Sequence, residues 1–145
     1  MFRSSLSRSF TKPGVLTFGE ALLTYKPLCQ QNGRATTEQL QAVGGAELNV
    51  AVALSRVGCA TTWTSVLPTG FLGDIILSAA HDAGVDVAAI RVEGADVGTL
   101  HVIDSGDGPR PHYQRKRSAF SEVADAETFD WATLLNGRSW LVLTG

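Results

Sequence analysis

Residues 44–58 read GGAELNVAVALSRVG, and this stretch decides the fold of the chain. The two glycines interrupt an alternating segment, small and apolar residues follow at once, and Gly58 closes the run. Glycine often lies just beyond the last helical turn, so the pattern predicts a turn, a helix and a C-terminal cap. Apolar residues occupy two faces of this helix, which predicts that it is packed on most sides. Asn49 lies in the first turn, where free N–H groups and two glycines would let the backbone approach a polar ligand.

Strands and helices alternate around this stretch. β-branched and apolar runs over 15–19 and 61–67 predict buried strands, and apolar residues at helical spacing predict a second helix over 72–83. Such units with short connections are typical of an α/β fold, in which a parallel sheet is covered by helices on both faces. A further helix is expected over 126–135 and another core strand over 140–145.

A second group of segments has a more exposed pattern. Residues 22–27 and 39–43 read as strands, and short strands over 85–92, 98–104 and 110–117 are joined by glycine-containing turns. These segments predict a small antiparallel accessory sheet beside the large one.

The composition bounds the class of protein. The chain has 145 residues, of which 44 % are hydrophobic and 18 % charged, and this suits one globular domain with a core. A net charge of −2 and short apolar runs predict neither a nucleic-acid partner nor a membrane partner. Residues 1–13 contain basic residues and serines but no acid, as in a short organelle transit peptide or in an unstructured leader. The predicted location is therefore the cytoplasm, or a mitochondrion or plastid if the leader directs transport.

Two groups of polar residues could carry chemistry. At residues 44–49, backbone N–H groups and the Asn49 amide could hold hydroxyls or a carboxylate, although tight packing of a helix on a strand explains the same residues equally well. Tyr113 and Arg115 point to one face of a strand because side chains alternate, and a hydroxyl beside a guanidinium suits a carboxylate. The alternative is a solvated basic edge strand. Glu20, at the end of a core strand, either faces a ligand crevice or is a solvated loop acid.

No other catalytic or metal site is expected. The three histidines have no partner at the spacing of a metal site or a catalytic triad. The chain contains neither a Gly-x-Gly-x-x-Gly motif nor a Walker A lysine motif. The basic segment 110–117 lacks the interleaved aromatic residues of an RNA-binding module.

Two of these stretches resemble a known family. The sequence GGAELN at 44–49 resembles the N-terminal signature of the PfkB, or ribokinase-like, carbohydrate kinases. It is most similar to the 2-keto-3-deoxygluconate kinases, which usually have valine where Leu48 stands. The sequence YQRKRSA at 113–119 resembles the Tyr-x-Arg-Lys-x-Ser-Ala segment of the same branch. The resemblance runs from about Val15 to the last residue and covers the N-terminal half of such a kinase.

The resemblance implies a ribokinase-like fold, with a mostly parallel sheet flanked by helices and a small β-sheet lid built from about 22–43 and 85–117. It implies transfer of the ATP γ-phosphoryl group to a hydroxyl of a sugar or sugar acid, with 2-keto-3-deoxygluconate as the leading substrate. Lids of this kind often pair in a homodimer. The implied substrate-binding residues are Gly44, Gly45, Ala46, Glu47, Asn49, Tyr113 and Arg115, with Glu20 as a further candidate.

The family's catalytic Gly-Ala-Gly-Asp motif and ATP pocket lie in the half that has no counterpart here. ATP and Mg²⁺ are therefore implied with binding residues outside this chain, and no catalytic residue is assigned within it. We expect residues 14–145 to be a truncated N-terminal part with little or no phosphoryl transfer by itself. Whether the chain is an enzyme stays open.

Two departures leave the sugar open. Many relatives carry Gly-x-Asp-x-x-Gly where this chain has PTGFLG at 68–73, and no tyrosine stands near Thr99 and Leu100. The alternatives are a ribokinase- or fructokinase-like sugar kinase and a non-catalytic sugar-binding remnant.

Overall fold

The computed structural model describes residues 14–27, 38–104 and 107–144, so the expected leader at 1–13 lies outside the described residues. The strands are β1 (Gly14–Phe18), β2 (Leu22–Pro27), β3 (Glu38–Gly44), β4 (Thr61–Pro68), β5 (Asp86–Val92), β6 (Gly98–Asp104), β7 (Pro109–Gln114) and β8 (Arg138–Val142). The helices are α1 (Ala46–Arg56), α2 (Phe71–Asp82), α3 (Ala119–Val123) and α4 (Trp131–Leu135), with a 3₁₀ turn η1 at Ala126–Thr128.

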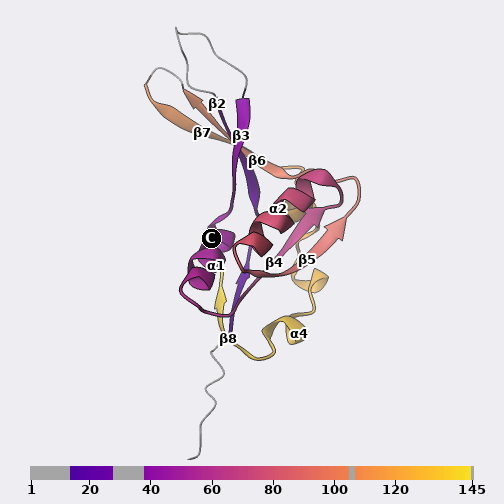
Figure 1. Ribbon diagram of the computed structural model, residues 1–145. Coiled ribbons are helices and arrows are strands. Elements are labelled where there is room, and N and C mark those ends of the chain that lie inside the picture. The colour runs from indigo at the N-terminus through magenta and orange to yellow at the C-terminus, as the bar shows by residue number, and fades with distance from the viewer. Residues whose placement is uncertain (1–13, 28–37, 105–106, 145) are drawn as a thin grey trace, which may run out of the picture.

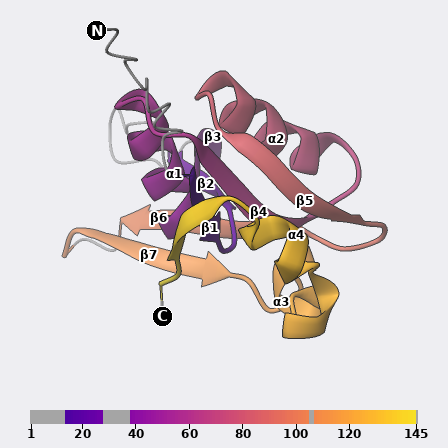
Figure 2. The same cartoon turned by 90° about the horizontal axis from the view of Figure 1, so that it is seen from below.

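The larger sheet, sheet A, has the strand order β5-β4-β1-β8, and its strands are parallel. Every residue of β4 is buried, as expected for a strand covered on both faces. Helices α1 and α2 lie on one face of sheet A, and α3 and α4 lie on the other (Figure 2). The predicted α/β architecture is confirmed.

The main core lies between sheet A and the two longer helices. Trp63 of β4 and Ile76 of α2 are fully buried, and Leu48 of α1 is nearly so. The Trp63 indole N–H donates to the carbonyl oxygen of Gly19 at 3.1 Å, which satisfies the polar atom of a buried ring. The core therefore holds the backbone just after β1 in place.

A second core, on the other face, is aromatic. The ring of Phe18 packs against Phe120, Phe129 and Trp131, with ring centroids 5.1 to 5.4 Å apart. Tilted and edge-on geometries of this kind add to the free energy gained from burial. This cluster attaches α3 and α4 to the end of β1.

The smaller sheet, sheet B, has the order β3-β2-β6-β7 and extends from one end of the molecule (Figure 1). Its β2–β3 and β6–β7 pairs are antiparallel, but β2 and β6 run parallel, so the sheet is mixed rather than antiparallel as expected. The assignment of 85–92 to this lid was wrong. Strand β5 follows α2 and pairs in parallel with β4 from Asp86 to Val92, which completes a β-α-β unit of sheet A.

Two local predictions also need correction. The helix expected over 126–135 is divided, because Phe129 adopts an extended backbone with its ring in the aromatic core, and Asp130 caps a new helix, α4. Helix α1 is less covered than expected: Leu48 and Ala51 are buried, but on the second apolar face Ala53 is exposed, and Val57, directly after the helix, is 75 % exposed. Two apolar faces in the sequence therefore did not mean two covered faces.

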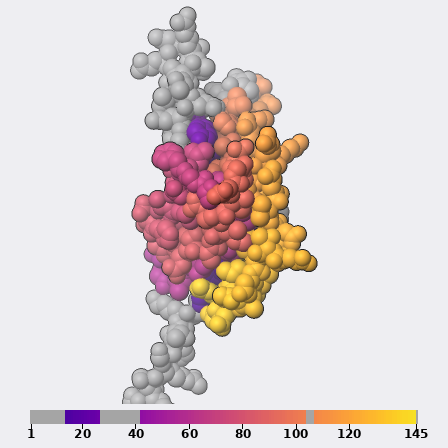
Figure 3. Space-filling model, turned by 90° about the vertical axis from the view of Figure 1, so that its right-hand side faces the viewer, coloured from indigo at the N-terminus to yellow at the C-terminus, as the bar shows by residue number. Residues whose placement is uncertain are grey.

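The outer surface of α2 and β5, in magenta and salmon, forms one face of the molecule, with the C-terminal segment in yellow at its lower right (Figure 3). Within the described ranges, no helix is both long enough and apolar enough to cross a membrane.

The cap of α4 gives a prediction for pH dependence. The pKa of Asp130 lies below its ordinary value of 3.8, chiefly because the Thr133 hydroxyl, and then its backbone N–H, donates to the carboxylate. A pKa that is lower in the folded state adds stability above about pH 4, and this is lost as pH falls through the folded-state value. Thr133→Val should raise the pKa of Asp130, as measured by NMR titration of its side-chain carboxyl.

The matched control is Thr128→Val, which removes a hydroxyl that donates to the carbonyl oxygen of Val123 instead. It should leave the pKa of Asp130 unchanged. An unchanged pKa in Thr133→Val would mean that the hydroxyl does not bond to the carboxylate in solution.

Candidate functional site

A cleft of about 720 Å³ lies between the end of β1, the start of α1 and one face of sheet B. Its volume is in the range of small-molecule sites. Its walls contain every residue that the sequence singled out: Glu20, Gly44, Gly45, Ala46, Glu47, Asn49, Tyr113 and Arg115. Segments 44–49 and 113–115 therefore meet in space, and their role in binding a sugar stays a prediction.

The glycines of the cleft allow close backbone packing. A Cβ on Gly45 would overlap with the carbonyl oxygen of Glu20 and would lie 3.1 Å from the Cα of Ala21. A Cβ on the neighbouring Gly44 would meet only the Thr24 hydroxyl, at 4.0 Å. Gly45 is therefore required by packing, and the packing interpretation of the two-glycine motif holds for Gly45 but not for Gly44.

Glu47, in the first turn of α1, is buried and bound within the protein. Its Oε1 accepts the backbone N–H of Thr144 at 3.0 Å and also accepts the Thr144 hydroxyl. A Cβ on Gly19 would overlap with the same carboxylate. A negative charge at a helix N-terminus is favoured by the helix dipole. Glu47 therefore joins α1 to the segment after β8, and these two bonds occupy its Oε1.

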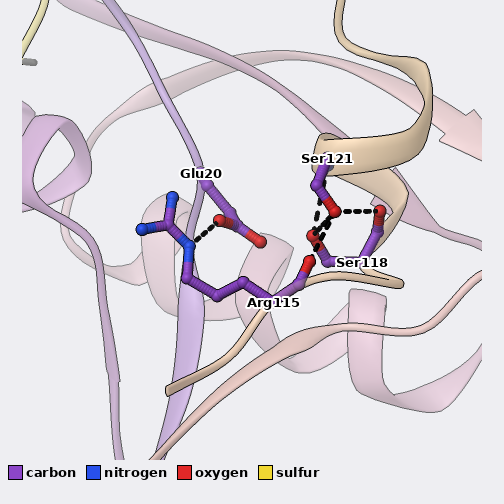
Figure 4. Close-up of polar contacts among 4 residues, drawn as sticks. All are labelled: Glu20, Arg115, Ser118 and Ser121. Carbon is purple, nitrogen blue, oxygen red and sulfur yellow. Dashed lines mark hydrogen bonds and ion pairs between the residues drawn. The ribbon is translucent and has the colours of Figure 1, made fainter.

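Glu20 and Arg115 form an ion pair between the ends of two strands. The Nε of Arg115 lies 2.5 Å from Oε2 of Glu20, whose side chain is 4 % exposed, whereas that of Arg115 is 52 % exposed (Figure 4). Glu20 follows β1 of sheet A, and Arg115 follows β7 of sheet B. The Glu20 carboxylate is therefore buried beneath a guanidinium that remains open to the cleft.

The backbone of Arg115 is held by two serines (Figure 4). Its carbonyl oxygen accepts the N–H of Ser118 at 3.1 Å and the hydroxyl of Ser121 at 2.5 Å. The Ser118 side chain also accepts the N–H of Ser121 at 3.2 Å and caps α3. The serine of the YQRKRSA segment thus has a structural role.

The start of α1 offers hydrogen-bond donors to the cleft. Gly45 is the N-cap and supplies no side-chain cap, so the first N–H groups of the helix lack that partner. Asn49 is exposed on the same wall, and Tyr113 across from it is 54 % exposed. Hydroxyl and carboxylate oxygens of a ligand could bind these groups.

Several lining residues were missed in the sequence. They are Phe18, Gly19, Leu22, Thr24, Leu100, Phe120, Leu143 and Thr144. Thr144 could have been found, because it follows β8, the parallel neighbour of β1, and the carboxyl ends of parallel strands share one edge. The same argument applies to Phe18, Gly19 and Leu143, whereas Leu22, Thr24 and Leu100 depend on how sheet B lies beside sheet A, for which the sequence contains no signal.

The described residues do not fit a magnesium–triphosphate group. No three His, Cys, Asp or Glu side chains in the described part of the chain gather as metal ligands. The lining of the cleft has one basic side chain, Arg115, against the carboxylates of Glu20 and Glu47. No step through such a group is derived from these residues.

Comparison with known proteins gives consistent findings. The pattern of the pfkB family carbohydrate kinases matches residues 12–137. The chain is 33 % identical over 97 residues to a 2-dehydro-3-deoxygalactonokinase of Haloferax volcanii, covering 67 % of this chain and 30 % of that protein. It is 32 % identical over 120 residues to a 2-dehydro-3-deoxygluconokinase of Bacillus subtilis, covering 80 % of this chain and 37 % of that protein.

A solved structure shares the fold. The crystal structure of 2-dehydro-3-deoxygluconokinase from Thermotoga maritima matches with a TM-score of 0.75 and 30 % identity, over 89 % of this chain and 40 % of that one. The chain therefore spans between 30 % and 40 % of the length of these three relatives.

Gly45→Ala should destabilise the fold by about 1–3 kcal/mol, because the new methyl group must displace the backbone of Glu20. The free energy of unfolding, measured by urea denaturation, tests this. Gly44→Ala is the matched control, since its methyl group has room, and it should change the free energy by much less. Equal effects of the two variants would contradict the packing role of Gly45.

Proposed function

Because the chain belongs to the pfkB family of carbohydrate kinases, we propose that it supplies the sugar-binding part of a kinase that phosphorylates 2-keto-3-deoxygluconate. One observation carries the sugar-acid assignment. Arg115 is the one basic side chain among the described residues that line the cleft, and it lies there with Tyr113 and the GGAELN segment. A single guanidinium in an otherwise neutral and acidic cleft suits a ligand with one carboxylate.

The geometry of Arg115 supports recognition of a carboxylate. Its Nε is bound to Glu20, and its guanidinium makes no other hydrogen bond or ion pair with a described residue. Two terminal nitrogens can then donate in parallel to the two oxygens of a ligand carboxylate. The exposed hydroxyl of Tyr113 can donate or accept beside them.

The opposite wall supports recognition of sugar hydroxyls. There the uncapped N–H groups at the start of α1 and the Asn49 amide supply several donors and one acceptor. The apolar side chains of Leu22, Leu100 and Phe120 line the rest of the cleft and can cover the carbon atoms of the ligand.

The names of the relatives support the same substrate class. Both curated relatives are named for a 2-dehydro-3-deoxy sugar acid, one for the galactonate and one for the gluconate. The shared part of these two compounds is the keto acid end, which is the part that Arg115 and Tyr113 would bind. We therefore expect either epimer to bind better than a neutral sugar.

Phosphoryl transfer is proposed for the whole kinase. Kinases of this family use ATP. The catalytic base and the groups that hold ATP and Mg²⁺ would come from outside the described residues, which supply the binding of the sugar acid. A homodimer formed through sheet B is a further proposal from the family resemblance.

Arg115→Lys tests the proposed function. A lysine keeps the positive charge beside Glu20, but it cannot bind Glu20 and also present a fork of two nitrogens. The affinity for 2-keto-3-deoxygluconate, measured by calorimetric titration, should fall about tenfold or more, or at least ~1.4 kcal/mol. The melting temperature should change little because the buried charge keeps a partner.

Arg110→Lys is the matched control. Arg110 is an exposed arginine of β7 whose ion pair is with Asp107, at 3.5 Å, and it does not line the cleft. Its replacement should leave the affinity unchanged. The proposal would be wrong if the wild-type chain, folded by circular dichroism, bound fructose as well as the sugar acid, or if Arg115→Lys bound the acid normally.

A further inference from the structure

Glu20 lines the cleft, but its side chain is buried beside Arg115. It is 4 % exposed, its Oε2 binds the Nε of Arg115, and its Oε1 has no hydrogen-bond partner among the described residues. Figure 4 shows the dashed contact at Nε, with the two terminal nitrogens beyond it at the end of the Arg115 side chain. A ligand in the cleft would therefore meet Arg115 rather than Glu20.

Glu20 is fixed in this orientation by packing. Its Oε1 lies against Gly98 at the start of β6, where a Cβ would come within 2.5 Å of this oxygen and of Leu22 Cδ2. The backbone of Arg115 is held separately by Ser118 and Ser121. The remaining freedom is in the long side chain of Arg115, and its contact with Glu20 restricts that freedom.

We propose that Glu20 is a positioning residue for Arg115, which binds Nε so that the two terminal nitrogens are directed at the carboxylate of a sugar acid. This inference rests on the proposed function, and it goes beyond it by assigning Glu20 an indirect role. An arginine can offer a carboxylate either its Nε side or the end formed by its two terminal nitrogens. Glu20 occupies the Nε side and leaves the two terminal nitrogens for the ligand. Because these two donors match the two oxygens of a carboxylate, Glu20 favours binding of an acid over a neutral sugar.

The negative charge of Glu20 also weakens non-specific attraction of anions to Arg115. A buried carboxylate beside Arg115 offsets part of the attraction that a free guanidinium would exert on any anion. Discrimination between the sugar acid and a neutral sugar then depends mainly on the direction of the two terminal N–H donors. The relevant measure is therefore the ratio of affinities for 2-keto-3-deoxygluconate and for the neutral sugar fructose.

Three variants test the role of Glu20 through this ratio, measured by calorimetric titration of the full chain. Glu20→Ala should lower the affinity for the acid about tenfold and the affinity for fructose less than about threefold, since a misplaced guanidinium affects the acid alone. Glu20→Gln keeps an oxygen that accepts the Nε proton and should keep the ratio within about threefold of wild type. Gly98→Ala, which displaces Glu20 by its methyl group, should lower the ratio without removing a charge.

Asp74→Ala is the matched control. It breaks an ion pair of similar length, Asp74–Arg91 at 2.7 Å, whose residues do not line the cleft. The ratio should stay at the wild-type value. Equal losses for acid and fructose in Glu20→Ala, or a loss in Glu20→Gln as large as in Glu20→Ala, would overturn the proposal.

A measurement without ligand separates this inference from the proposed function. In ¹⁵N NMR spectra, the side-chain Nε–H of Arg115 should exchange slowly with water in the wild type and in Glu20→Gln, and rapidly in Glu20→Ala. Rapid exchange in the wild type would overturn the positioning role even if the sugar acid binds. Slow exchange with no binding of the acid would instead contradict the proposed function.

Discussion

The close packing of backbone at the end of β1 is the constraint on which the rest of the structure depends. Three glycines from three different segments surround this point. Gly45 faces the carbonyl oxygen of Glu20, Gly98 faces the Glu20 carboxylate, and Gly19 faces the carboxylate of Glu47. A side chain at any of these positions would need the space that those atoms occupy. The indole N–H of the fully buried Trp63 donates a further hydrogen bond to the carbonyl oxygen of Gly19.

Two buried carboxylates extend from this point to the walls of the cleft. Glu20 reaches Arg115, 95 residues later in the chain, and Glu47 reaches Thr144, 97 residues later. Burial of a carboxylate is costly unless it is hydrogen-bonded or paired, and both of these have partners from distant segments. The same groups that close the fold therefore set the shape of the cleft, and polar residues in a cleft are not all ligands of the substrate.

The predicted elements differ in how much they depend on distant contacts. The strands β1 and β4 and the helices α1 and α2 follow from local patterns. Short runs of β-branched and apolar residues indicate buried strands, and apolar residues at helical spacing indicate the helices. The strand at 85–92 was found, but its sheet was not, since its half-buried residues suit either sheet and only the pairing with β4 decides. The helix expected over 126–135 is interrupted at Phe129, whose ring packs in the aromatic core around Phe18.

The sequence by itself determined the α/β class, because strand and helix patterns alternate along the chain. It also determined the candidate residues at 44–49 and 113–115, because glycine, asparagine and arginine can bind polar ligands wherever they are brought together. Only the tertiary structure decided which of them face the same cleft and what each one does there. It turned Glu47 toward Thr144 and Glu20 toward Arg115, while the Arg115 side chain stays half exposed. The physical reason is that a carboxylate is oriented by the donors that surround it, and these donors come from segments far away in the chain.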